Sequence, residues 1–171
     1  SRGDALEFLA EHGNDFDVIH ASPPCQRYSR LTPRQHRAEH PDLLPPVAAM
    51  LRRSGRRYVI ENVVTARHLL LNPIELCGSM FGLGVWRHRL FECPDLWGTL
   101  LPSCDHSQVP VLVTGTPRRK GYPRKDPSVA AKRKAMDLPW MTIRELDEAI
   151  PPAYTEFLGR QLLRQLKGAE L

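Results

Sequence analysis

Two polar positions in this sequence have side chains suited to covalent chemistry, and each follows a short apolar run. Cys25 comes after the run FDVIHA at 16–21, and Glu61 comes after the run RYVI at 57–60. A thiolate is a strong nucleophile, and a carboxyl group can act as a general acid or base. The two prolines directly before Cys25 would fix the direction of its thiol. The sequence therefore predicts a cysteine nucleophile assisted by a carboxyl group.

The elements that must position these two residues follow from the apolar pattern. Apolar residues at helical spacing predict helices over 4–12 and 43–53, and the two apolar runs predict strands buried on both faces of a parallel sheet. The order strand, loop, helix, strand is typical of a doubly wound α/β sheet, in which functional groups gather past the carboxyl ends of the strands. Cys25 and Glu61 each follow one strand, so we expect them to be neighbours in space.

The second half of the sequence predicts less regular structure. We expect an irregular stretch from Pro73 to Glu92, where glycines and charged residues interrupt the apolar pattern. A basic loop is expected over 117–134, since eight Lys or Arg residues there accompany one acid, Asp126. A helix is predicted over 154–166, because its apolar residues share one face.

Composition bounds the class of protein. The chain has 171 residues, of which 42% are hydrophobic and 25% charged, so it can bury a core and fits one ordinary domain. The sequence contains no apolar run near 18 residues, and we expect neither a membrane span nor a secretory leader. A net charge of +5 and a pI near 9.3 permit a polyanionic partner without requiring one.

The four cysteines indicate a reducing compartment rather than a disulfide framework. They lie far apart, without a CxxC pair, in a chain that is neither short nor rich in cysteine. Cys93, Cys104 and His106 do not match the spacing of a standard zinc site, and three candidate ligands are too few for one. We therefore expect no metal.

Five segments, in this order along the chain, resemble motifs of the DNA cytosine-5 methyltransferase family. They are Gly3-Asp4, Ser22-Pro23-Pro24-Cys25-Gln26, Glu61-Asn62-Val63, Arg87-His88-Arg89 and the segment 149–159. The resemblance implies an α/β, Rossmann-like S-adenosylmethionine-dependent methyltransferase fold, with a partial parallel sheet, helices on both faces and a short irregular target-recognition insertion. It divides the chain into a catalytic domain over 1–92, a basic insertion over 93–140 and a C-terminal helix over 141–171 that returns to the catalytic domain.

The resemblance also implies a chemical role for each residue of the site. The thiolate of Cys25 would add to carbon 6 of a cytosine flipped out of the duplex, and Glu61 would supply a proton or hydrogen bond at N3. Arg89 would hold the base oxygen, with Arg87 supporting it. Asn62 would orient the loop of Cys25. Carbon 5, activated in this way, would take a methyl group from S-adenosylmethionine.

Two further sets of residues follow from the same resemblance. The cofactor set consists of Asp4, Ala5, Pro23 and Pro24. The DNA set consists of Gln26, Ser29, Arg118, Arg119, Lys120, Arg124 and Lys125. The expected partner is double-stranded DNA, bound by a monomer in the cytoplasm of a prokaryotic or phage-infected host cell, with restriction–modification as one setting. The family's glycine-rich cofactor loop would lie before Ser1, so we expect this chain to be the back portion of a longer protein.

Two other functions stay open at this point. A methyltransferase relative that no longer transfers methyl groups would act as a DNA- or partner-binding module. A thiol-dependent enzyme acting on free nucleotides would use the same cysteine and acid but would not need the basic loop. That loop would either contact DNA phosphates or be a solvated surface.

Overall fold

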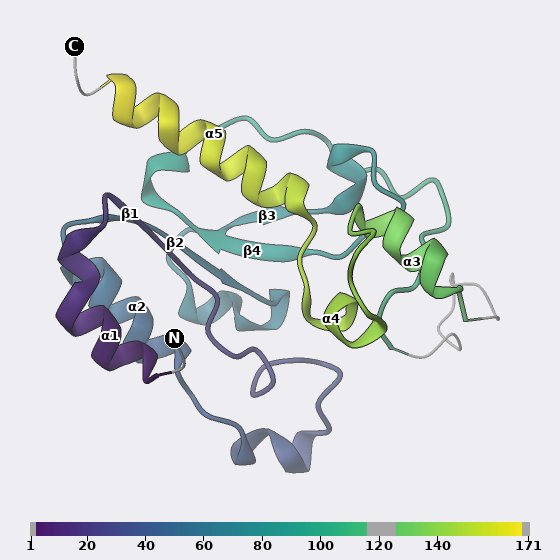
Figure 1. Cartoon of the computed structure of the whole chain (residues 1–171), viewed down its shortest axis with the longest axis horizontal. Coiled ribbons are helices and arrows are strands. Elements are labelled where there is room, and N and C mark those ends of the chain that lie inside the picture. The colour runs from purple at the N-terminus through teal and green to yellow at the C-terminus, as the bar shows by residue number, and fades with distance from the viewer. Residues whose placement is uncertain (1–2, 116–125, 169–171) are drawn as a thin grey trace. The chain divides into compact units, whose positions relative to one another are not determined.

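The computed structural model describes residues 3–115 and 126–168 (Figure 1). The chain divides into two units that interleave along the sequence. Unit 1 comprises Ser1–Glu75 and Arg89–Trp97, and unit 2 comprises Leu76–His88 and Gly98–Leu171. The sequence predicted boundaries after residues 92 and 140, whereas these units change after residues 75, 88 and 97. The return of residues 141–171 to the catalytic domain stays a prediction.

Short strands and helices alternate along the chain. The strands are β1 (Val18–Ala21), β2 (Arg57–Asn62), β3 (Ile74–Leu76) and β4 (Arg89–Glu92). The α-helices are α1 (Ala5–His12), α2 (Leu44–Arg53), α3 (Val129–Met136), α4 (Ile143–Glu148) and α5 (Pro152–Gly168). Short 3-10 helices are η1 (Gly13–Asp15), η2 (Arg34–Glu39), η3 (Val64–Leu69), η4 (Gly78–Phe81) and η5 (Pro94–Leu96). Among the described residues, no helix combines the length and apolarity that crossing a bilayer requires.

The strands form a mixed sheet of order β1-β2-β4-β3. β1 and β2 are parallel, with Ala21 opposite Ile60, while β4 runs antiparallel to β2, with Leu90 opposite Asn62. The α/β class and the parallel pair are therefore as predicted. The irregular stretch expected from residue 73 is wrong where β3 and β4 lie, and the sheet is not purely parallel.

Strand β1 differs from its prediction as a strand buried on both faces. Its residues are only partly buried, and His20 is exposed. The reason is position, because β1 lies at the edge of the described sheet, where an apolar run cannot be covered as fully as at the centre. β2, which lies between β1 and β4, is buried from Tyr58 to Asn62.

The core of unit 1 forms where α1 and α2 lie side by side next to β1 and β2 (Figure 1). Helix α2 buries one face, with apolar residues at the i, i+3, i+4 and i+7 positions, namely Leu44, Val47, Ala48 and Leu51. Prolines in its first turn cost no hydrogen bond there. Helix α1 begins at Asp4, whose Oδ1 accepts hydrogen bonds from the N–H groups of Leu6 (2.8 Å) and Glu7 (3.1 Å).

A fully buried carboxylate, Glu92 at the end of β4, joins several segments of unit 1. Arg52 of α2 donates to both of its oxygens, at 2.8 and 2.5 Å, while Tyr58 of β2 donates at 2.9 Å and the Leu71 N–H at 2.7 Å. Burial alone would raise the pKa of Glu92. The hydrogen bonds from these partners and the guanidinium charge outweigh burial and lower the pKa below its ordinary value.

Unit 2 has its own apolar core, in which α3 and α4 pack around Val85, Met136 and Leu146. Helix α3 shows that the predicted basic loop is wrong over 129–134, whereas residues 117–125 of that loop lie outside the described residues. Ser128 caps this helix, and the buried Lys132 pairs with Asp126 at 3.1 Å. An apolar face on a short helix, rather than its charge, decides the structure here.

Replacing Glu92 by Gln should destabilise unit 1 by about 1–3 kcal/mol, because the single oxygen of a buried Gln cannot accept the hydrogen bonds that Arg52, Tyr58 and the Leu71 N–H donate. The free energy of unfolding from urea denaturation measures this. Glu75→Gln is the control, since Glu75 pairs with Arg67 at the surface, and such pairs contribute about 0–1 kcal/mol. Equal effects of the two substitutions would contradict the central role of Glu92.

The same pair predicts a pH dependence. Because the pKa of Glu92 is lower in the folded state, its contribution is complete above the unfolded value of 4.5 and is lost as the pH falls through the folded pKa. The stability difference between wild type and Glu92→Gln should therefore be constant above pH 4.5 and shrink below it. A difference that instead grows on acidification would contradict this.

Candidate active site

The predicted nucleophile and acid belong to one edge of the sheet in unit 1. The loop of Cys25 follows the carboxyl end of β1, and Glu61 and Asn62 form the carboxyl end of β2. Since β4 runs antiparallel to β2, its first residue, Arg89, begins at the same edge. Parallel strands end together, so this edge gathers residues that are far apart in the sequence. We call it the carboxyl edge.

Glu61 and Arg89 form an ion pair at the carboxyl edge. Arg89 Nε lies 3.1 Å from Glu61 Oε1, and the side chains are 16% and 10% exposed, respectively. Both groups are therefore largely removed from water but not sealed off. A charged pair in this setting offers a carboxylate acceptor and a guanidinium donor side by side.

Asn62 connects the two strand ends. Its side chain is fully buried, its Nδ2 donates to the carbonyl of Pro23 at 3.0 Å, and its Oδ1 accepts from the Val63 N–H at 3.0 Å. The first bond fixes the backbone two residues before Cys25. Asn62 therefore acts on the loop rather than on a ligand.

The loop after Cys25 is a tight turn. The Cys25 carbonyl accepts from the N–H groups of Tyr28 (3.0 Å) and Ser29 (2.9 Å), and Thr65 donates to the Tyr28 carbonyl at 2.6 Å. Cys25 is half-buried. By contrast, Cys93 is fully buried, and burial, with the Asp95 charge, raises its pKa to about 11. Cys93 is therefore a poor candidate nucleophile.

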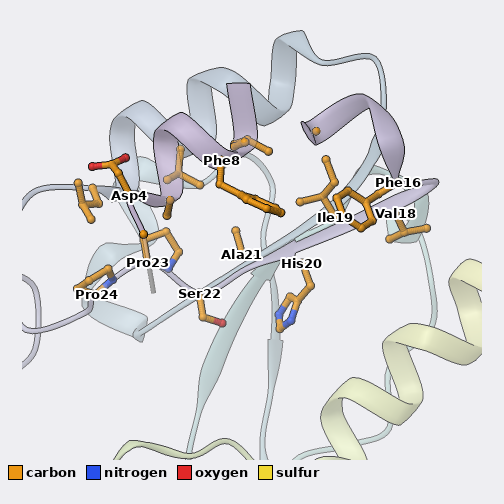
Figure 2. Close-up of a pocket in the computed structure, with 16 residues that line it drawn as sticks. Asp4, Phe8, Phe16, Val18, Ile19, His20, Ala21, Ser22, Pro23 and Pro24 are labelled. Carbon is orange, nitrogen blue, oxygen red and sulfur yellow. The ribbon is translucent and has the colours of Figure 1, made fainter. Parts of the chain in front are cut away.

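A pocket of about 610 Å³ lies beside α1 and β1 (Figure 2). All four residues of the predicted cofactor set line it, namely Asp4, Ala5, Pro23 and Pro24. Figure 2 shows Asp4 and Pro23 at one end and Phe16 at the other. Apolar side chains make up most of the rest, among them Phe8 and Ile19. Size and lining are those of a small-molecule site.

Three other predicted positions have different surroundings. Arg87 belongs to unit 2, where its Nε donates to the Ala149 carbonyl at 2.6 Å and its Nη2 to the Asp147 carbonyl at 2.7 Å. It thus holds the chain that follows α4, and its support of catalysis stays a prediction. Gln26 is exposed, and Ser29 accepts at Oγ from the Leu31 N–H. The predicted DNA contacts of the basic segment lie outside the described residues, namely Arg118, Arg119, Lys120, Arg124 and Lys125.

The sulfur and nitrogen atoms that lie together in the structure are not the three considered in the sequence. In unit 2 the structure brings Cys104 and His106 together with Cys77 and His88, whereas Cys93 is a core residue of unit 1. The expectation of no metal was based on three candidates, and the fold supplies four. In the sequence, Cys77 with His88 and Cys104 with His106 form two Cys–His pairs. The number of residues within each pair differs from that in common zinc motifs, so the sequence pattern did not indicate a zinc site.

The carboxyl edge combines the Glu61–Arg89 pair with the loop that contains the Cys25 thiol, and Pro23 and Pro24 of this loop line the apolar pocket. Such a set can add a nucleophile to an electron-poor ring while donors and acceptors hold the ring. Comparison of the chain with models of protein families, with curated proteins and with solved structures found no match.

Proposed function

We propose that this chain contains the catalytic edge of a DNA cytosine-5 methyltransferase with a Rossmann-like fold. The observation that carries the proposal is the convergence of the Cys25 loop and the Glu61–Arg89 pair at the carboxyl edge, next to a pocket lined by Pro23 and Pro24. The substrate would be a cytosine in double-stranded DNA, flipped out of the stack because its reacting atoms are covered inside the duplex.

The Glu61–Arg89 pair suits the hydrogen-bonding edge of cytosine. That edge presents an amino donor at position 4 and acceptors at N3 and O2. The carboxyl group can accept from the amino group and, once protonated, donate to N3, while the guanidinium donates to O2. The two side chains lie next to each other, with Arg89 Nε 3.1 Å from Glu61 Oε1, and this supports their acting together on one base.

The electron flow would begin at Cys25. Its thiolate adds to carbon 6, the electrons of the 5,6 double bond move toward N3 and O2, and a proton from Glu61 neutralises N3. Carbon 5 then has enamine character and takes a methyl group. Loss of the carbon 5 proton to a base, return of the N3 proton to Glu61 and departure of the thiolate restore the ring. Asn62, through the Pro23 carbonyl, holds the loop on which the sulfur must approach the ring face.

The pocket beside β1 supports S-adenosylmethionine as the methyl donor, which supplies an electrophilic methyl group when bound. Its apolar walls, with Phe8 and Ile19, suit a purine ring, and Asp4 offers a carboxylate at one end. Oδ1 of Asp4 caps α1, so we assign Oδ2 the contact with the adenine amino group.

The partner and setting belong to the same proposal. A net charge of +5 permits a polyanionic partner, and we propose that a monomer acts on DNA in the cytoplasm of a prokaryotic or phage-infected cell. DNA binding without attack on the base would instead favour a binding module.

Cys25→Ser should abolish exchange of the carbon 5 hydrogen of cytosine, because a hydroxyl does not ionise near neutral pH and cannot add to carbon 6. The assay follows tritium released to water from duplex DNA that contains [5-³H]cytosine. This exchange needs addition of the thiolate, uptake of a solvent proton at carbon 5 and reversal of the addition, and it needs no methyl donor.

The control is Cys93→Ala, which removes a thiol with a raised pKa from the core and should leave exchange unchanged below its melting temperature. Exchange retained by Cys25→Ser would exclude Cys25 from the mechanism. DNA binding retained with exchange absent even in the wild type would favour the binding module.

Glu61→Gln should slow both exchange and methyl transfer by about 10²–10⁴-fold, since an amide cannot deliver a proton to N3. The melting temperature must be measured alongside, because the guanidinium of Arg89 would lose its charged partner. Glu75→Gln, at a surface ion pair, is the matched control. A loss below about tenfold in a folded variant would count against acid catalysis by Glu61.

Asp4→Asn should weaken binding of S-adenosylmethionine about tenfold or more while leaving α1 intact. Asn caps helices as well as Asp does, but its single oxygen would serve the cap and its amino group would face the adenine amino group. Equilibrium dialysis measures binding, and circular dichroism measures the helix. Asp15→Asn, at an exposed position, is the control. Unchanged affinity in Asp4→Asn would remove Asp4 from the cofactor site.

A further inference from the structure

Four side chains of unit 2 direct sulfur or nitrogen atoms toward one point. They are Cys77, which precedes η4, His88, which precedes β4, and Cys104 and His106 of the chain that follows η5. Their ligand atoms all lie within 4.8 Å of one another. None of them belongs to the carboxyl edge or lines the pocket of unit 1.

The distances between these atoms are close to the edges of a tetrahedron around zinc. Cys104 Sγ lies 3.0 Å from His106 Nε2 and 3.5 Å from His88 Nε2, and Cys77 Sγ lies 3.4 Å from His106 Nε2. Zn–S bonds of about 2.3 Å and Zn–N bonds of about 2.0 Å at the tetrahedral angle separate sulfur and nitrogen by about 3.5 Å. The three sulfur–nitrogen distances equal this value or lie below it.

Hydrogen bonds alone account poorly for the arrangement. Nε2 of His106 faces both sulfurs, and one N–H or one lone pair cannot make linear bonds to two partners. A cation at the centre would use one lone pair from each of the four atoms. Two sulfur and two imidazole ligands prefer zinc to magnesium or calcium, and four protein ligands leave no position for a substrate.

Neighbouring residues orient the four ligands. The Trp86 indole stacks on the His106 ring, with centroids 4.1 Å apart and planes at 24°. Ser79 Oγ lies 3.2 Å from Cys77 Sγ and 3.7 Å from Cys104 Sγ, and it accepts from the Asp105 N–H at 3.1 Å. Its hydroxyl can donate to a thiolate, the kind of outer contact that metal-bound cysteines have.

The backbone around these four residues indicates that a metal bound there would have a structural role. Residues 97–115 contain no helix or strand, and long segments of this kind need ties to the rest of a unit. Gly78, next to Cys77, packs closely against Val85. A Cβ on residue 78 would lie 2.2 Å from the carbonyl oxygen of Val85. The Val111 N–H donates to the Gly84 carbonyl at 2.7 Å. Residues 77–88 thus form a well-packed base for the longer segment.

We propose that Cys77, His88, Cys104 and His106 bind one zinc ion, which ties the segment 98–115 to residues 77–88. The site is structural, and it does not depend on the methyltransferase proposal.

The test begins with the metal content of the untagged 171-residue chain, purified under reducing conditions without chelators. Mass spectrometry of the element should find one zinc per chain. Replacement by Co²⁺ should give the visible bands of tetrahedral cobalt and a thiolate-to-cobalt charge-transfer band. Removal of zinc by a chelator should lower the melting temperature and expose residues 98–115 to protease.

Variants separate this site from other thiols and imidazoles. Cys104→Ser and His88→Ala should lose zinc, while Cys25→Ser and His68→Ala should keep it. Ser79→Ala should retain zinc with an affinity about 10–100-fold lower. If the substituted proteins fail to fold, the cobalt spectrum of the wild type still decides. A zinc-free wild type without cobalt bands, a Cys77–Cys104 disulfide in its place, or full zinc in Cys104→Ser would each overturn the proposal.

Discussion

The carboxylate of Glu92 receives hydrogen bonds from α2, β2 and the chain before β3, and the arrangement of unit 1 depends on it. An ion buried this completely is tolerated only when its partners satisfy it, so the strand that contains it can adopt only one register. In that register Leu90 lies opposite Asn62, and Arg89 begins β4 beside Glu61. A structural carboxylate at one end of β4 thereby positions a guanidinium at the other.

Polar groups divide between two tasks in this unit. Glu92 and Asn62 are fully buried and direct their hydrogen bonds at the protein itself. Glu61 and Arg89 are nearly buried but keep some access to solvent, and Cys25 is half-buried. This gradient is expected where rigid inner contacts hold an outer layer of reactive groups in place.

Local pattern was enough to predict the elements whose apolar residues are regularly spaced. Helices α1 and α2 begin one residue after the predicted position, and α5 is longer than predicted by two residues at each end. Strand β4 was missed because its arginine and glutamate look like surface residues until their partners, which are distant in sequence, are known. The four metal-ligand candidates were missed for the same reason, since Cys77 and His88 approach Cys104 and His106 only in the folded chain.

The interleaving of the two units has a consequence for synthesis on the ribosome. Arg52 and Tyr58 are synthesised 40 and 34 residues before Glu92. Residues 76–88, which belong to unit 2, are synthesised between them and β4. A nascent chain that ends before β4 therefore has a guanidinium without its counter-charge and a central strand with one side uncovered. Such chains resemble folding intermediates with exposed strand edges, which invite chaperones and aggregation. Unit 1 can complete its fold only after residue 92 has left the exit tunnel, so it should fold late for its position in the sequence.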